Sequence, residues 1–268
     1  MELFENYYEF KQTPFSRGIP TDKLYRGMSF NELADRLKYA ANRQLFAVLT
    51  GDCGVGKTTA LRRFSNELKP AEHVIMYISD SKLTPRYFYK GLLEQLGFDS
   101  KWHSGDAKRQ LHKEIELIRA ANGPMPTVIV DEAHLLSRDM LEEVRFLLNF
   151  RMDSQSPMAL ILSGQPELWD KLKRQSYAAI RQRIDVKCGI NRMDRAHTFE
   201  YIKAHLDYAQ CERDIFTDAA IDAIFKYSGG IARLINKACV SALLYGAQNR
   251  KSIVDDHMVK LVINCELS

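Results

Sequence analysis

A run of small and polar residues between positions 51 and 58 has the spacing needed to bind a phosphate. It fits the pattern GxxxxGK(S/T), in which Lys57 and Thr58 close the motif. Glycines let backbone N–H groups turn inward around a phosphate, and a helix that starts here adds partial positive charge. The lysine of such a P-loop reaches the β- and γ-phosphates, and the threonine hydroxyl binds Mg²⁺. The predicted nucleotide-binding residues are Gly51, Asp52, Cys53, Gly54, Val55, Gly56, Lys57, Thr58 and Thr59.

Two acidic residues, Asp131 and Glu132, end a later apolar run that begins at Thr127. We predict that Asp131 holds the Mg²⁺ shell together with Thr58, and that Glu132 polarises a water for attack on the γ-phosphate of ATP. Acidic residues often end strands, so the pair alone is weak evidence for a catalytic site. Its position after the P-loop makes that evidence strong. His134 completes the letters D-E-A-H, which also occur in helicases, but a chain of this length has no second motor domain. We expect His134 to be a neighbour of the site without a direct catalytic part.

The elements that position these residues alternate between strands and helices. Apolar runs predict strands at 45–50, 73–79, 127–132, 158–163 and 185–188. Helical spacing predicts helices at 31–41, 58–68, 84–97, 108–121, 141–150 and 167–174. Strands of this kind, apolar on both faces, indicate a parallel sheet that helices cover on both sides. The predicted fold class is therefore α/β, a three-layer αβα P-loop domain with a parallel sheet. With a strand before residues 51–58 and a helix after them, an ordinary Gly-rich turn is the less favoured interpretation of this segment.

The strand signals stop near residue 192, and further helical stretches follow at 196–210, 217–227, 232–248 and 254–262. We predict an N-terminal strap at 1–30, a P-loop core at 31–191 and a small all-α domain at 192–268. The strap is rich in aromatic residues and irregular. Two interpretations of it stay open: it covers core surface, or it forms a lid over an adenine ring.

The composition limits the possible partners and the compartment. A formal net charge of +4 over 268 residues permits a polyanionic partner without requiring one. The five cysteines form no CxxC pair, which is typical of reduced thiols in a cytosolic protein. The N-terminus lacks a secretory signal pattern, and no apolar run is long enough to span a bilayer. We expect a cytoplasmic protein that does not insert into a membrane.

Four further sequence blocks, in order, support a resemblance to a known family. They are residues 131–136, 160–168, 180–184 and 227–236. With the P-loop they resemble the AAA+ ATPases, and more narrowly the ExeA/GspA group, over most of the chain. The resemblance implies that 192–268 is the AAA+ lid domain. The group includes secretion-associated ATPases and, as shorter chains, ATPase partners of DDE transposases related to the TnsC, TniB and IstB types.

The resemblance also implies roles for polar residues outside the P-loop. Gln165 is implied as sensor 1, which orients water against the γ-phosphate, and Ser163 is the alternative; both can also be read as turn residues. Arg183 or Arg181 is implied as the arginine finger presented to a neighbouring subunit, and the Arg-Ile step favours Arg183. Arg233, after two glycines, matches sensor 2. A finger requires a homo-oligomer, either a ring or a filament.

Two function classes follow from the resemblance. The first is an ATP-hydrolysing regulator that oligomerises on double-stranded DNA, selects a target and recruits or activates a DDE transposase. It is favoured because the chain ends near residue 268, without the membrane span and periplasmic region expected of the secretion type. The alternative is a cytosolic ATPase that energises a secretion or envelope assembly machine through protein partners. A third possibility, a nucleotide-gated adaptor with negligible turnover, is disfavoured by Glu132.

DNA contacts are implied at two places, the start of the helix after the second strand and the loop before the next helix. Cationic and hydroxyl side chains there suit phosphate contacts, which give salt-dependent affinity with little sequence choice. A solvated surface is the competing interpretation, and Trp102 can serve as a packing residue in either case. The implied DNA-binding residues are Lys82, Thr84, Arg86, Lys101 and Ser104.

Overall fold

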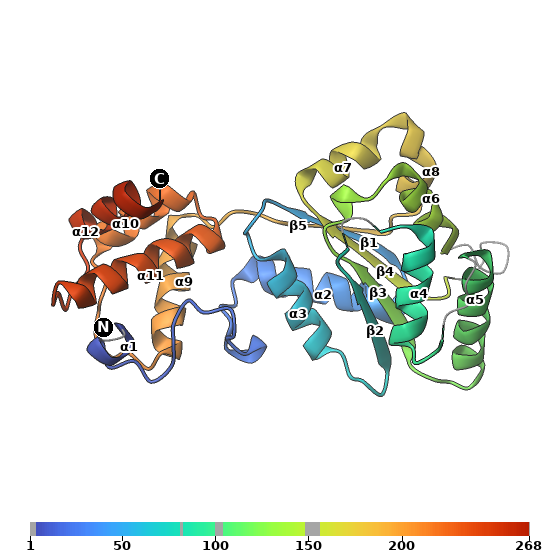
Figure 1. Cartoon of the computed structure of the whole chain (residues 1–268), viewed down its shortest axis with the longest axis horizontal. Helices are drawn as coiled ribbons and strands as arrows, with labels where there is room; N and C mark the ends of the chain where they lie inside the picture. The colour runs from blue at the N-terminus through green and yellow to red at the C-terminus, as the bar shows by residue number, and fades with distance from the viewer. Residues whose placement is uncertain (1–3, 81–82, 100–103, 148–155, 268) are drawn as a thin grey trace. The chain divides into compact units, whose positions relative to one another are not determined.

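The computed structural model describes residues 4–80, 83–99, 104–147 and 156–267. The chain divides into two compact units, whose elements are labelled in Figure 1. The α/β unit comprises Ser29–Gly51 and Lys57–Ile190. The helical unit comprises Met1–Met28, Asp52–Gly56 and Asn191–Ser268. The predicted N-terminal strap thus groups with the C-terminal helices, and so does the middle of the predicted P-loop.

The α/β unit is built on a five-stranded sheet with the strand order β2-β3-β4-β1-β5. Its strands are β1 (Phe46–Gly51), β2 (His73–Ile78), β3 (Met125–Val130), β4 (Ala159–Gly164) and β5 (Val186–Ile190). All the neighbouring strands run parallel. The prediction of an α/β fold with a parallel sheet is therefore confirmed. Because all the strands point the same way, their carboxyl ends lie at one edge of the sheet, where β1, β3 and β4 each lead into a predicted site residue.

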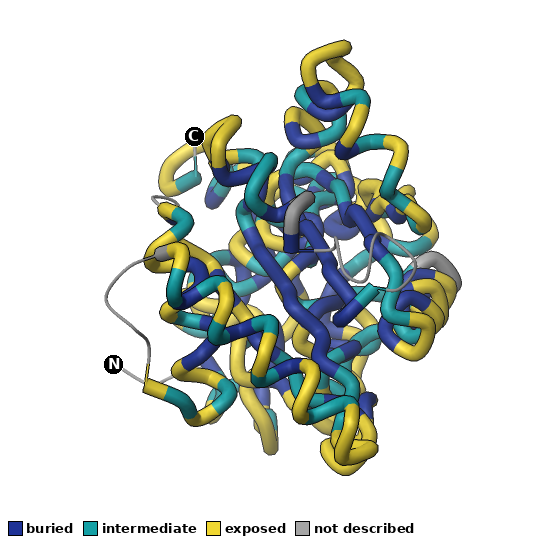
Figure 2. Tube along the Cα trace, turned by 90° about the vertical axis from the view of Figure 1, so that its right-hand side faces the viewer, coloured by how far each residue is buried: buried dark blue, intermediate teal, exposed yellow. Residues whose placement is uncertain are grey.

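Helices cover both faces of this sheet, and Figure 1 shows α2 and α3 on one side with α4 and α5 on the other. The helices of the unit are α2 (Met28–Arg43), α3 (Lys57–Glu67), α4 (Pro85–Gln95), α5 (Ser104–Ala120), α6 (Arg138–Leu147), α7 (Pro166–Lys173) and α8 (Ala178–Arg181). Short 3₁₀ turns occur at η2 (Ala133–Leu135) and η3 (Gln175–Tyr177). Successive strand residues such as Val128 and Ile129 are both fully buried, as expected for a sheet covered on two sides. Figure 2 shows these buried strands inside helices whose outer faces are exposed.

Three helices, α2, α5 and α6, begin three or four residues earlier than their sequence patterns predict. α6 begins at Arg138 because the hydroxyl of Ser137 accepts the N–H of Met140 at 3.2 Å and so caps the first turn. α5 begins at Ser104, inside the segment predicted to be the loop before this helix. The buried pair Ala107 and Leu111, four residues apart, shows that the inner face of α5 starts one turn before the predicted helix.

The helical unit contains α1 (Phe4–Tyr7), α9 (Arg195–Tyr208), α10 (Asp218–Ser228), α11 (Ala232–Gln248) and α12 (Asp256–Val262). A 3₁₀ turn, η1 (Thr21–Lys23), and a final π-helical turn, η4 (Ile263–Leu267), complete it. Side-chain oxygens of Asp194, Thr217 and Asp255 accept backbone N–H groups at the starts of α9, α10 and α12. Within the part of the chain that the structure describes, none of the helices has the length and apolar character needed to cross a membrane.

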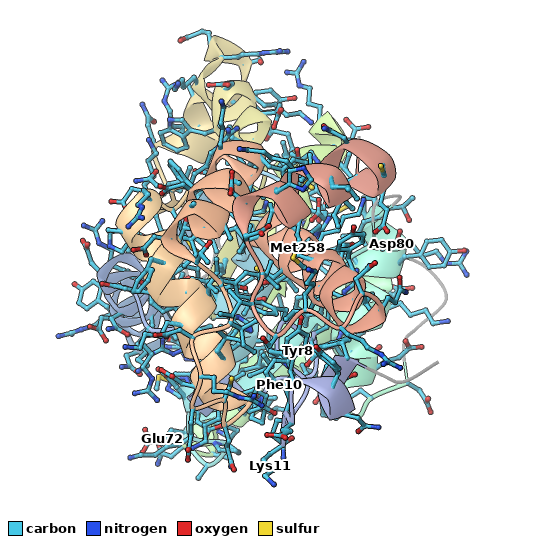
Figure 3. The ribbon with its side chains drawn as sticks, turned by 90° about the vertical axis from the view of Figure 1, so that its left-hand side faces the viewer. Tyr8, Phe10, Lys11, Glu72, Asp80 and Met258 are labelled. Atoms are coloured by element: carbon cyan, nitrogen blue, oxygen red, sulfur yellow. The ribbon has the colours of Figure 1, made fainter. Side chains whose placement is uncertain are left out.

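The N-terminal segment covers the core of the helical unit. Phe4 and Tyr8 are buried there, and the Tyr8 hydroxyl donates to the carbonyl of Lys251 at 2.9 Å. Tyr8 also stacks on Phe10, with ring centroids 5.7 Å apart, and Figure 3 shows the two side by side. Gly246 makes room for this contact, since a Cβ at that position would lie 2.1 Å from the Tyr8 oxygen. The aromatic residues of the segment thus contribute to a hydrophobic core.

A buried histidine makes the stability of the helical unit depend on pH. The backbone N–H of Phe15 donates to Nδ1 of His205 at 3.0 Å, and the Phe15 ring stacks on the imidazole. Burial lowers the pKa of His205 from 6.5 to about 4. The folded protein therefore binds this proton less readily than the unfolded chain. The stabilisation is complete above pH 6.5 and is lost as the pH falls from 6.5 toward 4.

We expect the free energy of unfolding to fall by about 3 kcal/mol over this window because of His205 alone. Denaturant unfolding of the wild type and of His205→Gln at pH 7 and pH 4.5 measures the effect. The variant should be less stable at pH 7 but lose less stability on acidification. His257→Gln, which changes an exposed histidine of the same unit, is the control and should follow the wild-type profile. An equal acid slope in the wild type and His205→Gln would exclude His205 as the cause.

Candidate nucleotide-binding site

The predicted P-loop lies between the end of β1 and the start of α3. Gly54 and Gly56 have φ values of +82° and +108°, which side chains with a Cβ rarely adopt. Lys57 is the first residue of α3 and is only 6% exposed. Its Nζ donates to the carbonyl of Gly51, the first residue of the motif, at 2.8 Å. A cation held over a glycine-rich loop at a helix N-terminus can bind phosphate.

Asp131, directly after β3, is the most strongly hydrogen-bonded side chain of the site. Its Oδ2 accepts from Thr58 Oγ1 at 2.8 Å and from the Tyr77 hydroxyl at 3.0 Å. Its Oδ1 accepts from Ser163 Oγ at 2.8 Å and from the backbone N–H of Glu132 at 3.0 Å. The strand order explains this arrangement, since β2, β3 and β4 are neighbours and the residues near their carboxyl ends meet.

The contact between Thr58 and Asp131 suits Mg²⁺. A hydroxyl oxygen and a carboxylate oxygen, 2.8 Å apart, are hard ligands of the type that Mg²⁺ prefers. Mg²⁺ is commonly bound by one or two protein oxygens, with waters and substrate phosphates supplying the rest of its octahedron. The residues present therefore fit this metal, and Thr58 and Asp131, predicted from the sequence as the metal-binding pair, lie together.

Glu132 has an unusual backbone conformation, with φ 53° and ψ 30°, in the left-handed region. Strained conformations of residues other than glycine are concentrated at functional sites. The side chain is 41% exposed, and its Oε2 lies 3.6 Å from Nδ1 of His134. The exposed carboxylate is therefore available to a water molecule, while His134 limits its orientation.

The two alternatives for sensor 1 occupy different environments. Ser163 is fully buried at the end of β4 and donates to Asp131. Gln165 is the N-cap residue of α7, and its Nε2 lies 3.1 Å from Nε2 of His134. His134 thus connects Gln165 with Glu132. The sequence predicted only that His134 is a neighbour of the site. The D-E-A-H letters were the available signal for this contact.

Tyr77 is a residue of the site that sequence reasoning missed. It lies in β2, opposite Ile129 of β3, and its hydroxyl reaches the Asp131 carboxylate. Burial and the nearby Asp131 carboxylate raise the pKa of the Tyr77 hydroxyl to about 12. The hydroxyl is therefore protonated at neutral pH and acts as a donor to Asp131. A tyrosine near the end of a mostly apolar strand was the sequence signal.

The two candidates for the arginine finger differ in their contacts. Arg181, the last residue of α8, donates through Nη1 to the carbonyls of Leu172 at 3.4 Å and Lys173 at 2.5 Å. These contacts cap the end of α7. Arg183 is half-buried in the segment between α8 and β5, and its backbone N–H donates to Ile180.

Arg233 belongs to the helical unit together with the loop Asp52–Gly56. Its backbone N–H donates to the carbonyl of Gly54 at 3.0 Å, and its Nη1 lies 3.7 Å from Cys53 Sγ. A Cβ at Gly54 would lie 2.9 Å from the Arg233 Cβ, so glycine is required for this approach. Arg192 forms an ion pair with Asp52 at 2.5 Å, a contact that was not predicted. Two arginines of the helical unit therefore contact the loop.

The glycines before Arg233 set the start of α11. Gly229 ends α10 in the left-handed conformation. Gly230 lies so close to Met193 that a Cβ would be 1.8 Å from the Met193 carbonyl oxygen. Only glycine fits there, which explains the physical need for the Ser-Gly-Gly sequence that the resemblance singled out.

The residues predicted to contact DNA are only partly described. Thr84 is the N-cap of α4, where its side chain accepts from the N–H of Tyr87, and both Thr84 and Arg86 are exposed. Ser104 is the first residue of α5. Lys82 and Lys101 lie outside the described residues, as does Trp102.

Comparison with known proteins places this site in a family. The AAA domain family matches residues 40–172, which include the P-loop, Asp131 and Glu132. The chain is 30% identical over 244 residues to general secretion pathway protein A of Aeromonas hydrophila, covering 90% of this chain and 44% of that protein. It is 26% identical over 166 residues to the ATP-dependent target DNA activator B of Escherichia phage Mu, covering 60% of this chain and 49% of that protein. The chain thus spans less than half the length of each.

A solved structure of Drosophila ORC bound to DNA shares the fold, with a TM-score of 0.74 and 18% identity over 99% of this chain and 66% of that chain. The fold agrees with the sequence comparisons and with the P-loop geometry. The chain carries an AAA domain at residues 40–172, and it shares its fold with the ORC structure.

Proposed function

We propose that this protein binds ATP with Mg²⁺ and hydrolyses it to ADP and phosphate. The observation that carries the proposal is the hydrogen bond between Thr58 and Asp131, made beside Glu132 at the carboxyl edge of the sheet. Lys57 turns its ammonium group from the Gly51 carbonyl to the β- and γ-phosphates. Bound Mg²⁺ supplies positive charge that stabilises the transferred phosphoryl group.

The polar residues around Asp131 then perform separate tasks. Glu132 accepts a proton from the attacking water, and its exposed carboxylate is held in direction by His134. Gln165 reaches the same histidine and orients the water, as proposed for sensor 1. Ser163 acts through Asp131, because it is fully buried and its hydroxyl donates to that carboxylate. These contacts support Gln165 over Ser163 as the sensor.

We infer that the active form is a homo-oligomer in which Arg183 completes a neighbouring subunit's site. The contacts of Arg181 with two carbonyls of α7 give it a helix-capping role, which supports Arg183 as the finger. A guanidinium at the γ-phosphate can raise the rate by about 10³-fold or more. Arg233 is proposed as sensor 2, since its contacts with Cys53 and Gly54 link the nucleotide loop to the helical unit.

We further propose that the oligomer assembles on double-stranded DNA and recruits or activates a DDE transposase. The similarity to the phage Mu target DNA activator supports this role, and so does the fold shared with a DNA-bound ORC. Thr84 and Arg86 present a hydroxyl and a guanidinium at the exposed start of α4. Such groups bind phosphates without reading the base sequence.

The second candidate function is that of an ATPase in the cytosol that drives a secretion or envelope assembly machine through protein partners. The similarity to general secretion pathway protein A, at 30% identity, favours it. The two candidates share the ATPase site and differ in what the protein binds. DNA binding therefore separates them.

We expect ATP-dependent binding to random-sequence duplex DNA, and we expect it to weaken at least about tenfold between 50 and 200 mM salt. Anisotropy of a labelled duplex, with a non-hydrolysable ATP analogue and Mg²⁺, measures both. Arg86→Ala should weaken binding to all sequences alike and reduce the salt slope by about one. Arg213→Ala, which removes an exposed arginine of the helical unit that pairs with Glu9, is the control. Absence of DNA binding at low salt would favour the secretion-type function.

A further inference from the structure

The Tyr77 hydroxyl makes a contact that the proposed reaction does not use. It donates to Asp131 Oδ2 at 3.0 Å, the same oxygen that accepts from Thr58 Oγ1. Tyr77 thus occupies a position on the metal-binding oxygen.

The hydrogen bonds of Asp131 account for its whole acceptor capacity. A carboxylate oxygen has about two lone-pair sites, so the group can accept about four hydrogen bonds. Thr58 and Tyr77 take the two sites on Oδ2, while Ser163 and the Glu132 N–H take the two on Oδ1. A water bound to Mg²⁺, or the metal itself, therefore needs one of these donors to leave.

The donors differ in their freedom to leave Asp131. The Glu132 donor is a backbone N–H, and Ser163 is fully buried. Thr58 can keep its hydrogen on Asp131 while its oxygen lone pairs bind the metal. Tyr77 is 40% exposed and lines an open cavity of about 430 Å³. Tyr77 is therefore the donor with space to move.

The backbone of Tyr77 is held in place, so only its side chain can rotate. β2 is an edge strand, and the side-chain amide of Gln95 from α4 takes the place of a missing neighbouring strand. Gln95 Oε1 accepts the Tyr77 N–H at 2.8 Å, and Gln95 Nε2 donates to the Tyr77 carbonyl at 3.1 Å. Gln95 and Ser79 also line the cavity.

We propose that Tyr77 is a positioning residue that competes with Mg²⁺ for Asp131 and leaves it for the cavity when the metal–nucleotide complex binds. The proposal rests on the proposed ATPase function. It predicts that Tyr77 sets the Mg²⁺ concentration that the site requires. The affinity of the P-loop for the nucleotide without metal should not depend on Tyr77. The metal affinity is kept lower than Thr58 and Asp131 alone would give.

The test measures binding of a fluorescent ATP analogue, MANT-ATP, as a function of Mg²⁺ concentration. Tyr77→Phe keeps the ring and removes the hydroxyl. We expect its half-saturating Mg²⁺ concentration to fall about three- to tenfold, the range of one net hydrogen bond. Affinity for MANT-ATP in EDTA should stay within about twofold of wild type. Tyr87→Phe removes a hydroxyl from the same cavity without touching Asp131, and it should match wild type in both measurements.

A second measurement follows the side chain itself. With 3-fluorotyrosine in place of Tyr77, the ¹⁹F resonance should shift when Mg²⁺ and the ATP analogue are both present, and stay unshifted with the analogue in EDTA. An unchanged or higher Mg²⁺ requirement in Tyr77→Phe overturns the proposal. A ¹⁹F resonance that does not shift when Mg²⁺ is added with the ATP analogue overturns it as well. Failure of the wild type to bind MANT-ATP at any Mg²⁺ concentration overturns the proposed ATPase function as well, which distinguishes the two failures.

Discussion

Replacing Lys57 by alanine should weaken ATP binding at least about 100-fold, which corresponds to about 2.7 kcal/mol. Lys57 is 6% exposed, and its ammonium group donates to the Gly51 carbonyl. The variant removes a charge-assisted contact with two phosphates, and each such contact contributes about 1.5–3 kcal/mol. Titration with MANT-ATP in the presence of Mg²⁺ measures the change.

Lys69→Ala is the matched control for Lys57→Ala. It removes a lysine from the same unit, where Lys69 forms an exposed ion pair with Glu72 at 2.9 Å. We expect this variant to fold normally, because an exposed pair of this kind contributes little to stability. Its ATP affinity should equal that of the wild type. Thermal unfolding of both variants checks that they are folded. Near-normal affinity in a folded Lys57→Ala would remove the P-loop assignment.

Replacing Glu132 by glutamine should lower the ATPase turnover by about 10²–10⁴-fold while ATP still binds. Glutamine has nearly the same shape but cannot accept the proton of the attacking water. The carboxylate is 41% exposed and contacts His134 at 3.6 Å, so the change leaves Asp131 and its four donors in place. Phosphate release under saturating ATP measures turnover, and MANT-ATP titration measures binding.

Glu167→Gln, at an exposed position in the first turn of α7, is the control and should retain normal turnover. Mixing gives a further check, because subunits of Glu132→Gln keep Arg183. If sites are shared between neighbours, mixtures of Glu132→Gln with Arg183→Ala should recover part of the activity that each lacks alone. Normal turnover by Glu132→Gln would show that another group activates the water.

Much of the nucleotide site was predictable because its determinants are local. The P-loop needs glycines at positions of positive φ, and Gly54 and Gly56 have them. It also needs a helix that starts at Lys57, and α3 does. Apolar runs on both sides of the motif predicted the parallel sheet, which follows from burial on two faces. Asp131 and Glu132 were found for the same reason, since they end a continuous apolar strand.

Contacts between separate segments could not be predicted in this way. Periodicity indicates a strand but does not specify its neighbours, and here the order β2-β3-β4 brings Tyr77, Asp131 and Ser163 together. The contact of Arg233 with Gly54 likewise joins positions far apart in the chain. The same holds for the N-terminal segment, whose irregular sequence gave no periodic signal although Tyr8 is buried in the helical unit.

The sequence by itself determined the phosphate loop, the acidic pair and the alternation of strands and helices, because each depends on residues adjacent in the chain. Only the tertiary structure decided that Tyr77 and Ser163 share Asp131, that Gln165 reaches Glu132 through His134, and that Arg181 caps α7. Those contacts are set by strand order and side-chain packing. Both are properties of the folded chain as a whole.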